Sequence, residues 1–252
     1  MGLIRCHLQY AIVRTPSSKF YGGAGKISVW KPYVERDSEF SLAQMWVVSG
    51  LGDTTETLEV GWHRNEPRLF IFWTADSYKK TGCYNLNCDA FKHTSGYVTP
   101  GASLLDYSKV GGQLITLDIE IAKEERTKHW WLKINNEVVG YWPGNLFKWL
   151  DDGAQTVEWG GEITNDVRQT KSHTSTEMGS GLFPSDGIGK SAFAHTLKVI
   201  KTPNGPFKDP PKVNAYKTNV KCYDLVRNRY GFPYVGVNFF FGGKGRTQGG
   251  CL

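Results

Sequence analysis

The chain of 252 residues is 40% hydrophobic and 13% aromatic, which is enough apolar material for a folded core and excludes a disordered chain. Its net charge is +6, but the 30 lysines and arginines stand mostly singly or in pairs, so nothing indicates a nucleic-acid partner. No stretch approaches the roughly 20 apolar residues that cross a bilayer, so we expect a soluble protein with no membrane partner.

Strand patterns dominate the sequence from its beginning to its end. Most are short, rich in β-branched and aromatic residues, and bounded by Gly, Pro, Asn or Asp, which is typical of an antiparallel sandwich or barrel. The predicted strands cover residues 26–30, 41–50, 57–62, 68–75, 113–121, 129–135, 137–142, 155–163, 195–200 and 235–241. Asn135 and Asn136 predict a hairpin turn, because asparagine tolerates the positive φ that such turns require.

Residues 143–153 contain the one helical pattern. Leu146, Phe147 and Leu150 would share one face of a short helix between a proline and a glycine. Three apolar side chains on one face are what a packing surface needs, so this helix is expected to close an end of the sandwich.

Four of the five cysteines have spacings that suit disulfide bonds. Cys83 and Cys88 lie in a tight loop between strands, and Cys222 and Cys251 could pin the C-terminal tail, which leaves Cys6 over. No histidine completes a zinc-finger spacing with them, so no metal site is expected. Disulfide bonds indicate an oxidising compartment, although a cytosolic protein with free thiols is the alternative.

The chain shows no internal repeat and no linker between two compositional halves. We therefore predict one domain over residues 1–252, with residues 1–8 as a flexible start. The N-terminus lacks the apolar core of a signal peptide, which conflicts with an oxidising compartment. The simplest resolution is a mature or truncated piece of a longer secreted precursor.

Two glutamates stand in aromatic, glycine-rich strands, where a charge has no obvious structural role. Strand alternation places Glu59 with Gly61 on one face of its strand, and Glu162 with Gly160 on one face of another. The glycines would leave space for a substrate or water beside each carboxylate, although a solvated glutamate and a bulge are the plain alternatives. Two carboxylates in one cleft would share a proton and supply an acid and a base for amide or glycoside hydrolysis.

Longer motifs follow one another in order from about residue 9 to the C-terminus. They are QMWVVSG (44–50), EVGWHRN (59–65), RLFIFWTADSYKKTGCYNLNC (68–88), HWWLKI with VGYWP (129–143), VEWGGEI (157–163), TEMGSGLFPSDGIGKSAF (176–193) and the final GGKGR with its following cysteine. Together they resemble the neprosin family of plant glutamic peptidases.

The resemblance implies a secreted, acid-active endopeptidase that cleaves after proline. It implies an all-β fold, an antiparallel sandwich of two sheets of about seven strands each, similar to concanavalin and jelly-roll folds. The family's catalytic glutamates match Glu59 and Glu162, one serving as general base and the other as general acid. Its disulfides match two pairs here, Cys83 with Cys88 and Cys222 with Cys251.

Family members carry a signal peptide and an inhibitory propeptide upstream, so this chain resembles their mature catalytic domain. The segment HRNEPRLF, which follows EVGW, is shorter than in many members, which concerns substrate preference more than chemistry. We predict that Trp62, Tyr84 and Trp159 stack on the substrate proline beside Gly160 and Gly161, with core packing as the alternative for each aromatic ring.

The expected partners are a proline-containing peptide or protein substrate and an inhibitory propeptide, and we expect a monomer without a cofactor. Two other functions are compatible with the same residues. One is a lectin-like sandwich glycosidase that uses the same carboxylate pair, and the other is a binding or storage protein that kept the fold and lost turnover.

Overall fold

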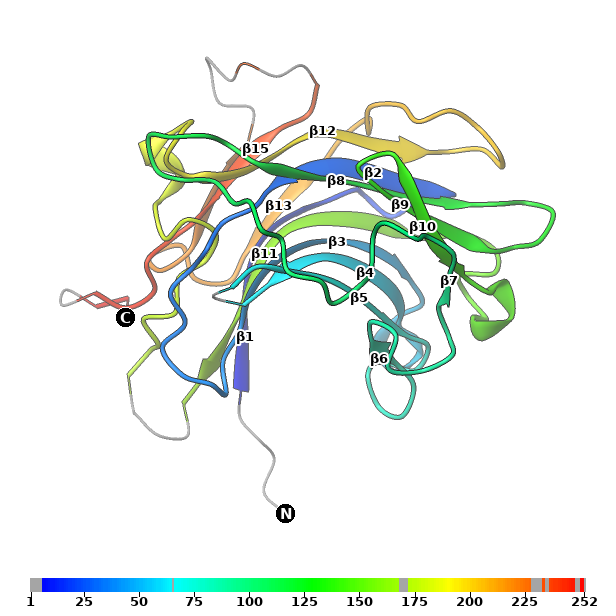
Figure 1. Cartoon of the computed structure of the whole chain (residues 1–252), viewed down its shortest axis with the longest axis horizontal. Coiled ribbons are helices and arrows are strands. Elements are labelled where there is room, and N and C mark those ends of the chain that lie inside the picture. The colour runs from blue at the N-terminus through cyan, green and yellow to red at the C-terminus, as the bar shows by residue number, and fades with distance from the viewer. Residues whose placement is uncertain are drawn as a thin grey trace.

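Two antiparallel β-sheets pack face to face in this computed structural model, which confirms the predicted all-β sandwich (Figure 1). The structure describes residues 6–64, 66–167, 172–227, 233, 236–247 and 250–251. Within that part of the chain, no helix is long and apolar enough to cross a membrane.

The seven-stranded sheet contains both glutamates. In spatial order its strands are β13 (Asn214–Lys217), β1 (Cys6–Arg14), β11 (Thr156–Asp166), β3 (Ser41–Ser49), β4 (Glu56–His63), β5 (Arg68–Thr74) and β6 (Cys83–Tyr84). Strand β1 pairs with β11 along its whole length, so residues 6–8 belong to the sheet and our prediction of a flexible start is wrong for them. Residues 1–5 of that prediction lie outside the described residues.

The eight-stranded sheet forms the second layer. In spatial order its strands are β14 (Asp224–Arg227), β15 (Phe239–Gly242), β12 (Ala192–Ile200), β2 (Gly22–Ser28), β8 (Thr116–Lys123), β9 (Trp130–Ile134), β10 (Glu137–Trp142) and β7 (Lys92–His93). The predicted hairpin between β9 and β10 is confirmed, because Asn135 and Asn136 have φ of 50° and 67°. The last predicted strand covers 235–241, of which residue 235 lies outside the described residues, and the observed strand begins only at Phe239.

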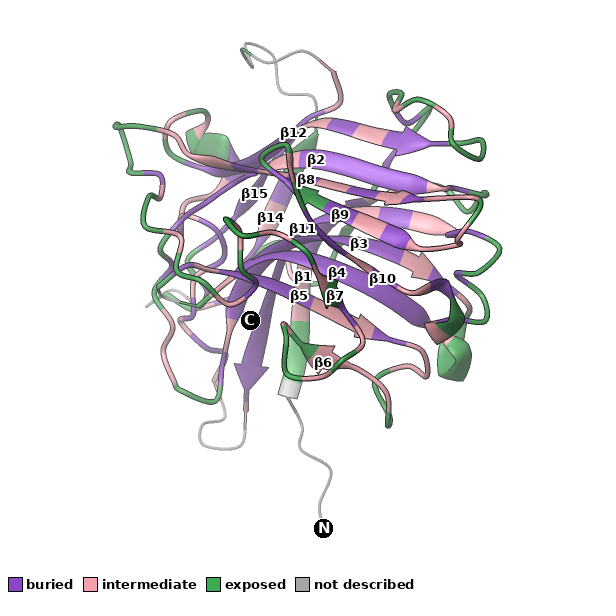
Figure 2. Ribbon diagram, turned by 45° about the vertical axis from the view of Figure 1, so that its right-hand side comes forward, coloured by how far each residue is buried: buried purple, intermediate pink, exposed green. Residues whose placement is uncertain are grey.

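The core lies between the two sheets and is rich in aromatic side chains. Strand β8 alternates, with Leu117, Ile119 and Ile121 buried and the residues between them partly exposed. Strands β3 and β4 differ, because they are buried along nearly all of their length (Figure 2). Since one face of each strand already packs in the core, the centre of the seven-stranded sheet also has a covered outer face.

The predicted helix over residues 143–153 is wrong. Only Gly144–Leu146 forms a 3-10 turn, and Phe147 is already extended. The Glu56 carboxylate accepts the backbone N–H groups of the next three residues at 2.8 Å each, which takes them out of any helical hydrogen-bond series. Phe147 and Leu150 are nevertheless buried in the core, as their apolar character predicts.

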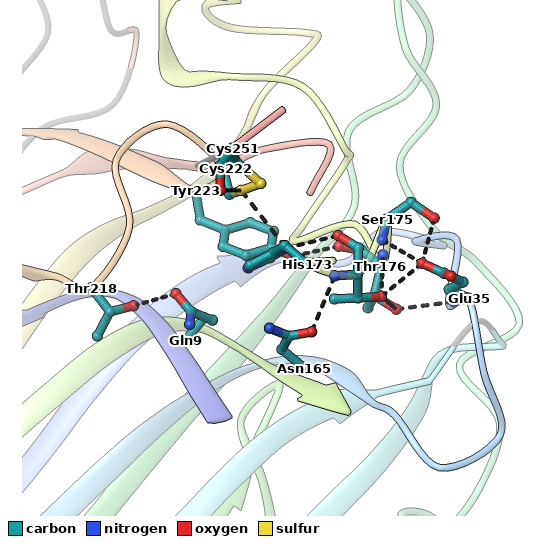
Figure 3. The surroundings of a disulfide bond; sticks show 11 residues. Gln9, Glu35, Asn165, His173, Ser175, Thr176, Thr218, Cys222, Tyr223 and Cys251 are labelled. Carbon is teal, nitrogen blue, oxygen red and sulfur yellow. Dashed lines mark hydrogen bonds between the residues drawn. A yellow bond between two sulfur atoms is a disulfide. The ribbon is translucent and has the colours of Figure 1, made fainter. Parts of the chain in front are cut away.

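Both predicted disulfide bonds are present. Cys83 and Cys88 close a short loop, and Cys222 and Cys251 join positions 29 residues apart (Figure 3). On a chain-entropy estimate, closing a loop of that length stabilises the fold by about 3 to 4 kcal/mol. His173 lies beside the second bond, with Nδ1 3.7 Å from Cys222 Sγ, so these three residues could bind a metal only with the bond reduced.

Candidate active site

The amide of Gln44 joins Glu59 and Glu162 at the centre of the seven-stranded sheet. Gln44 lies on β3, between Gly61 of β4 and Gly160 of β11. Its Nε2 lies 3.2 Å from Oε2 of Glu59 and 3.5 Å from Oε2 of Glu162. The two carboxylates, which are 103 positions apart in the sequence, therefore lie on one face and share a donor.

Hydroxyl groups complete the surroundings of the two carboxylates. Oε1 of Glu59 accepts hydrogen bonds from the Tyr78 hydroxyl at 2.6 Å and from Thr57 Oγ1 at 2.7 Å. Tyr10 lies opposite Glu162 on the neighbouring strand, and its hydroxyl lowers the pKa of that carboxyl. Both glutamates are only 7% exposed, so the protein, rather than bulk water, sets their protonation.

The two carboxylates differ in how readily they ionise. Burial, reinforced by the negative charge of Glu59, raises the pKa of Glu162 to about 8. Burial also raises the pKa of Glu59, but hydrogen bonds from Tyr78, Thr57 and Gln44 stabilise its ionised form. Glu162 therefore holds a proton at neutral pH, and Glu59 is the carboxylate with three hydrogen-bond donors.

Three of the five residues predicted to contact the substrate face the core of the sandwich, on the side of the sheet opposite the glutamates. Trp62 and Trp159 are fully buried between the sheets, and Trp62 Nε1 donates to the carbonyl of Ser28 at 3.0 Å. A Cβ at Gly161 would lie 2.7 Å from Met178, so this position also faces the core. These residues alternate with the glutamates along their strands, which places them on the opposite face of the sheet.

Tyr84 and Gly160 do lie on the face of the glutamates. The Tyr84 ring packs on Phe72 with ring centroids 4.8 Å apart, and on His63 at 6.1 Å. Partial burial and the charges of Glu59 and Glu162 raise the pKa of Tyr84 to about 12. Their contact with substrate stays a prediction.

The glycines beside the carboxylates do not leave the open space that we predicted. A Cβ at Gly61 would lie 2.1 Å from the carbonyl oxygen of Ala43, and a Cβ at Gly160 would lie 2.4 Å from that of Ala11. Gly160 also has φ of 146°, which other residues rarely adopt. Glycine at these positions allows the neighbouring strands to approach closely.

Apolar and aromatic side chains surround the glutamates, although they are not the ones we predicted. A buried cluster on this face has partly buried hydrophobic side chains packed against it. Its members are Ile12, Leu42, Trp46 and Phe70, with Tyr10, Phe40, Val48 and Phe72 against them. They give the site the low polarity that strengthens electrostatic effects on a reacting group.

Sequence reasoning missed three residues that hydrogen-bond the glutamates, and Tyr10, which lies opposite Glu162. Gln44 and Thr57 carried a usable signal, because each is a polar residue at a site-facing position of a strand. Tyr78 lies in a loop and Tyr10 in a strand that we did not predict, so nothing local marked either of them.

A cavity of about 730 Å³ reaches the cross-strand neighbour of Glu162 on this face, although neither glutamate is among the residues that line it. Its wall includes Leu42, which pairs across the sheet with Glu162 on one side and His63 on the other. Tyr84 also lines it. The carboxylate pair therefore lies next to a space that could accept part of a substrate.

Comparison with known proteins agrees with these observations. The family model described as Neprosin matches residues 37–244, which is most of the chain. The crystal structure of scytalido-glutamic peptidase with a transition state analog inhibitor superposes with a TM-score of 0.50 at 10% identity, covering 94% of this chain and 98% of that one. SCP-B, a member of the Eqolisin family of peptidases in a complex with the tripeptide Ala-Ile-His, gives a TM-score of 0.41 at 11% identity, covering 95% and 98%. The first of these likenesses concerns the fold alone.

Proposed function

Because this chain belongs to the neprosin family, we propose that it is a glutamic peptidase in which Glu59 and Glu162 activate water against a peptide bond. The observation that carries this proposal is the pair of buried carboxylates bridged by Gln44, one of them with its pKa raised to about 8. The likeness to scytalido-glutamic peptidase supports a fold that can hold such a pair.

The unequal environments of the two carboxylates support one division of roles between them. Glu59, with three hydrogen-bond donors, acts as general base and takes a proton from the water that attacks the scissile carbonyl carbon. Glu162, which is protonated, gives its proton to the leaving nitrogen as the C–N bond breaks. The products are a carboxylic acid and an amine, and a proton passing from Glu59 to Glu162 restores the starting state.

Cleavage after proline belongs to this proposal. The rings of Phe72, Tyr78 and Tyr84 pack together near Glu59, and the exposed parts of the two tyrosine rings offer apolar surface to a pyrrolidine ring. A peptide mixture digested by the protein should contain fragments that end in proline, as mass spectrometry would reveal. Cleavage with no preference for proline would reject this specificity and leave the peptidase proposal standing.

An acidic, extracellular place of action is also part of the proposal. The two disulfide bonds suit an oxidising compartment. Low pH keeps Glu162 protonated, as its role requires, and the hydrogen bonds to Glu59 oppose the rise that burial causes in the pKa of that carboxyl. The rate should therefore fall as pH rises through about 8, and fall again in acid as Glu59 becomes protonated.

Isosteric substitutions test the mechanism. Glu59→Gln and Glu162→Gln should each lower kcat/KM on a proline-containing peptide by about 10²- to 10⁴-fold, because each removes one proton-transfer group. Glu158→Gln is the matched control, since Glu158 lies on the same face but pairs with Arg14 at 3.4 Å and should cost less than about tenfold. Undiminished cleavage by either active-site variant would overturn the mechanism, and hydrolysis of β-glucan in place of peptide would favour the glycosidase.

A further inference from the structure

The cavity beside Glu162 contains charged groups that the proposed hydrolysis does not use. Arg64 and Arg68 both line it. Arg68 donates to the carbonyl of Gly101 at 3.1 Å, and Arg64 is exposed at the end of β4. Across the part of the chain that the structure describes, neither guanidinium forms an ion pair with a carboxylate.

A third arginine in the wall is different. Arg36 binds Glu35 at 2.7 Å and Glu39 at 3.1 Å, so protein carboxylates already balance its charge. Glu39 in turn accepts hydrogen bonds from Thr174 and Thr176. This network builds the wall and leaves Arg64 and Arg68 as the cavity's positive groups.

Of the remaining titratable groups of the wall, the carboxylate of Asp37 offsets only part of the charge of the two arginines. Burial, reinforced by the charges of Arg64 and Arg68, lowers the pKa of His63 to about 4, so His63 is neutral above that pH. Asp37 is exposed at the rim, and Tyr84 is un-ionised at any pH below about 12. At mildly acidic pH the cavity is therefore a positive, partly enclosed space beside the carboxylate pair.

We propose that this cavity is a substrate subsite that binds an acidic side chain of the peptide, with Arg64 and Arg68 as the residues that select it. A guanidinium group presents a planar fork of donors that matches a carboxylate. Leu42 and His63 form the wall nearest to Glu162, so a peptide held at the carboxylate pair passes the mouth of the cavity. This inference rests on the proposed peptidase function and adds a preference to it.

Paired peptides test the subsite. Each pair differs only by Glu or Gln at one position, scanned along both sides of the cleaved bond, with kcat/KM measured at pH 5.5 and pH 3. At one position the Glu peptide should be preferred about tenfold at pH 5.5, which corresponds to about 1.4 kcal/mol. The preference should vanish at pH 3, where a glutamate side chain with its ordinary pKa of about 4.3 is protonated.

Variants assign the preference to the two arginines. In Arg64→Gln and Arg68→Gln the ratio of Glu to Gln peptide should fall toward one, and Arg68→Lys should keep part of it because it keeps the charge. Arg126→Gln is the control, since it removes one positive charge from an exposed side chain in the loop between β8 and β9 of the other sheet. Thermal melts confirm that each variant is folded.

The outcomes separate this inference from the peptidase proposal. Cleavage of both peptides of every pair at equal rates, or a Glu preference that persists in the Arg64→Gln, Arg68→Gln double variant, overturns the subsite and leaves the peptidase standing. If no peptide is cleaved, the peptidase proposal fails, and the subsite is judged by calorimetric binding of the same pairs to Glu59→Gln. Equal affinity of that variant for the Glu and Gln peptides rejects the subsite.

Discussion

Gln44 shows how one side chain can couple the two carboxylates of the proposed catalytic pair. Its Nε2 reaches both carboxylates, and a donor to a carboxylate favours the ionised form and lowers the pKa. Leu42 and Trp46 make the surroundings of these two hydrogen bonds apolar, and a hydrogen bond in apolar surroundings is stronger than in water. Gln44 is therefore a positioning residue that also sets where the pair titrates.

Gln44→Met tests this role, because it keeps the length of the side chain and removes the amide. Without the donor, the pKa of Glu59 should rise further, so the acidic limb of the pH–rate profile should move to higher pH. We expect kcat to fall by about tenfold or more with little change in KM. A profile that keeps its acidic limb while kcat falls would show that Gln44 serves packing alone.

The turn between β5 and β6 places Tyr78 over Glu59. Ser77 and Tyr78 have φ of 59° and 62°, a left-handed conformation that non-glycine residues seldom adopt. The Asp76 carboxylate holds the turn by accepting the backbone N–H groups of residues 79, 80 and 81. Burial opposes ionisation of Asp76, but bonds from Thr81 and these N–H groups outweigh it and lower its pKa to about 2.

Asp76→Ala should release this turn and with it the Tyr78 hydroxyl. We expect kcat/KM to fall about tenfold, with a small change in melting temperature because the turn lies outside the core. Tyr78→Phe should cause a similar loss, and the double variant should be no worse than either single one. Additive losses in this double-mutant cycle would mean that Asp76 does not act through Tyr78.

Across the whole molecule, buried acidic groups link stability to pH. The pKa of Glu162 is about 8 in the folded protein against an ordinary value of 4.5. Its contribution to stability is therefore fully present below pH 4.5 and is lost as pH rises through about 8. His63 and His195 act in the opposite direction, because burial lowers the pKa of each to about 4 and their contribution is lost as pH falls.

The difference between the wild type and Glu162→Gln isolates this effect. Glutamine cannot ionise, so the melting temperature of the variant should fall less between pH 4.5 and pH 8.5. Over this pH range the free energy of unfolding should change by a few kcal/mol more in the wild type than in the variant, which corresponds to roughly 5 to 10 °C in melting temperature. The other groups titrate equally in both proteins, so they do not contribute to this difference. Parallel curves measured by calorimetry would mean that Glu162 ionises normally in the folded state.

Local patterns in the sequence predicted the architecture and identified the pair of glutamates at the centre of the site. Alternation in β4 and β11 placed Glu59 and Glu162 on one face of each strand, because successive side chains in a strand point to opposite sides. Asn135 and Asn136 marked their turn through their own backbone preferences. Cysteine spacing and the ordered motifs gave the disulfide pairs and the family.

Only the tertiary structure decided what meets the carboxylates. The face of a strand that lines the site and the face that fills the core are equally aromatic here, so Trp62 and Trp159 could not be assigned from sequence. The segment after Pro143 has a helical sequence pattern, but its N–H groups donate to the carboxylate of Glu56, which is distant in the sequence. The order of the strands places Gln44 between the two glutamates, and it places a cavity with two arginines next to this pair. Such contacts join residues that are far apart in the chain of 252 residues, so no local pattern predicts them, and neither does the net charge of +6.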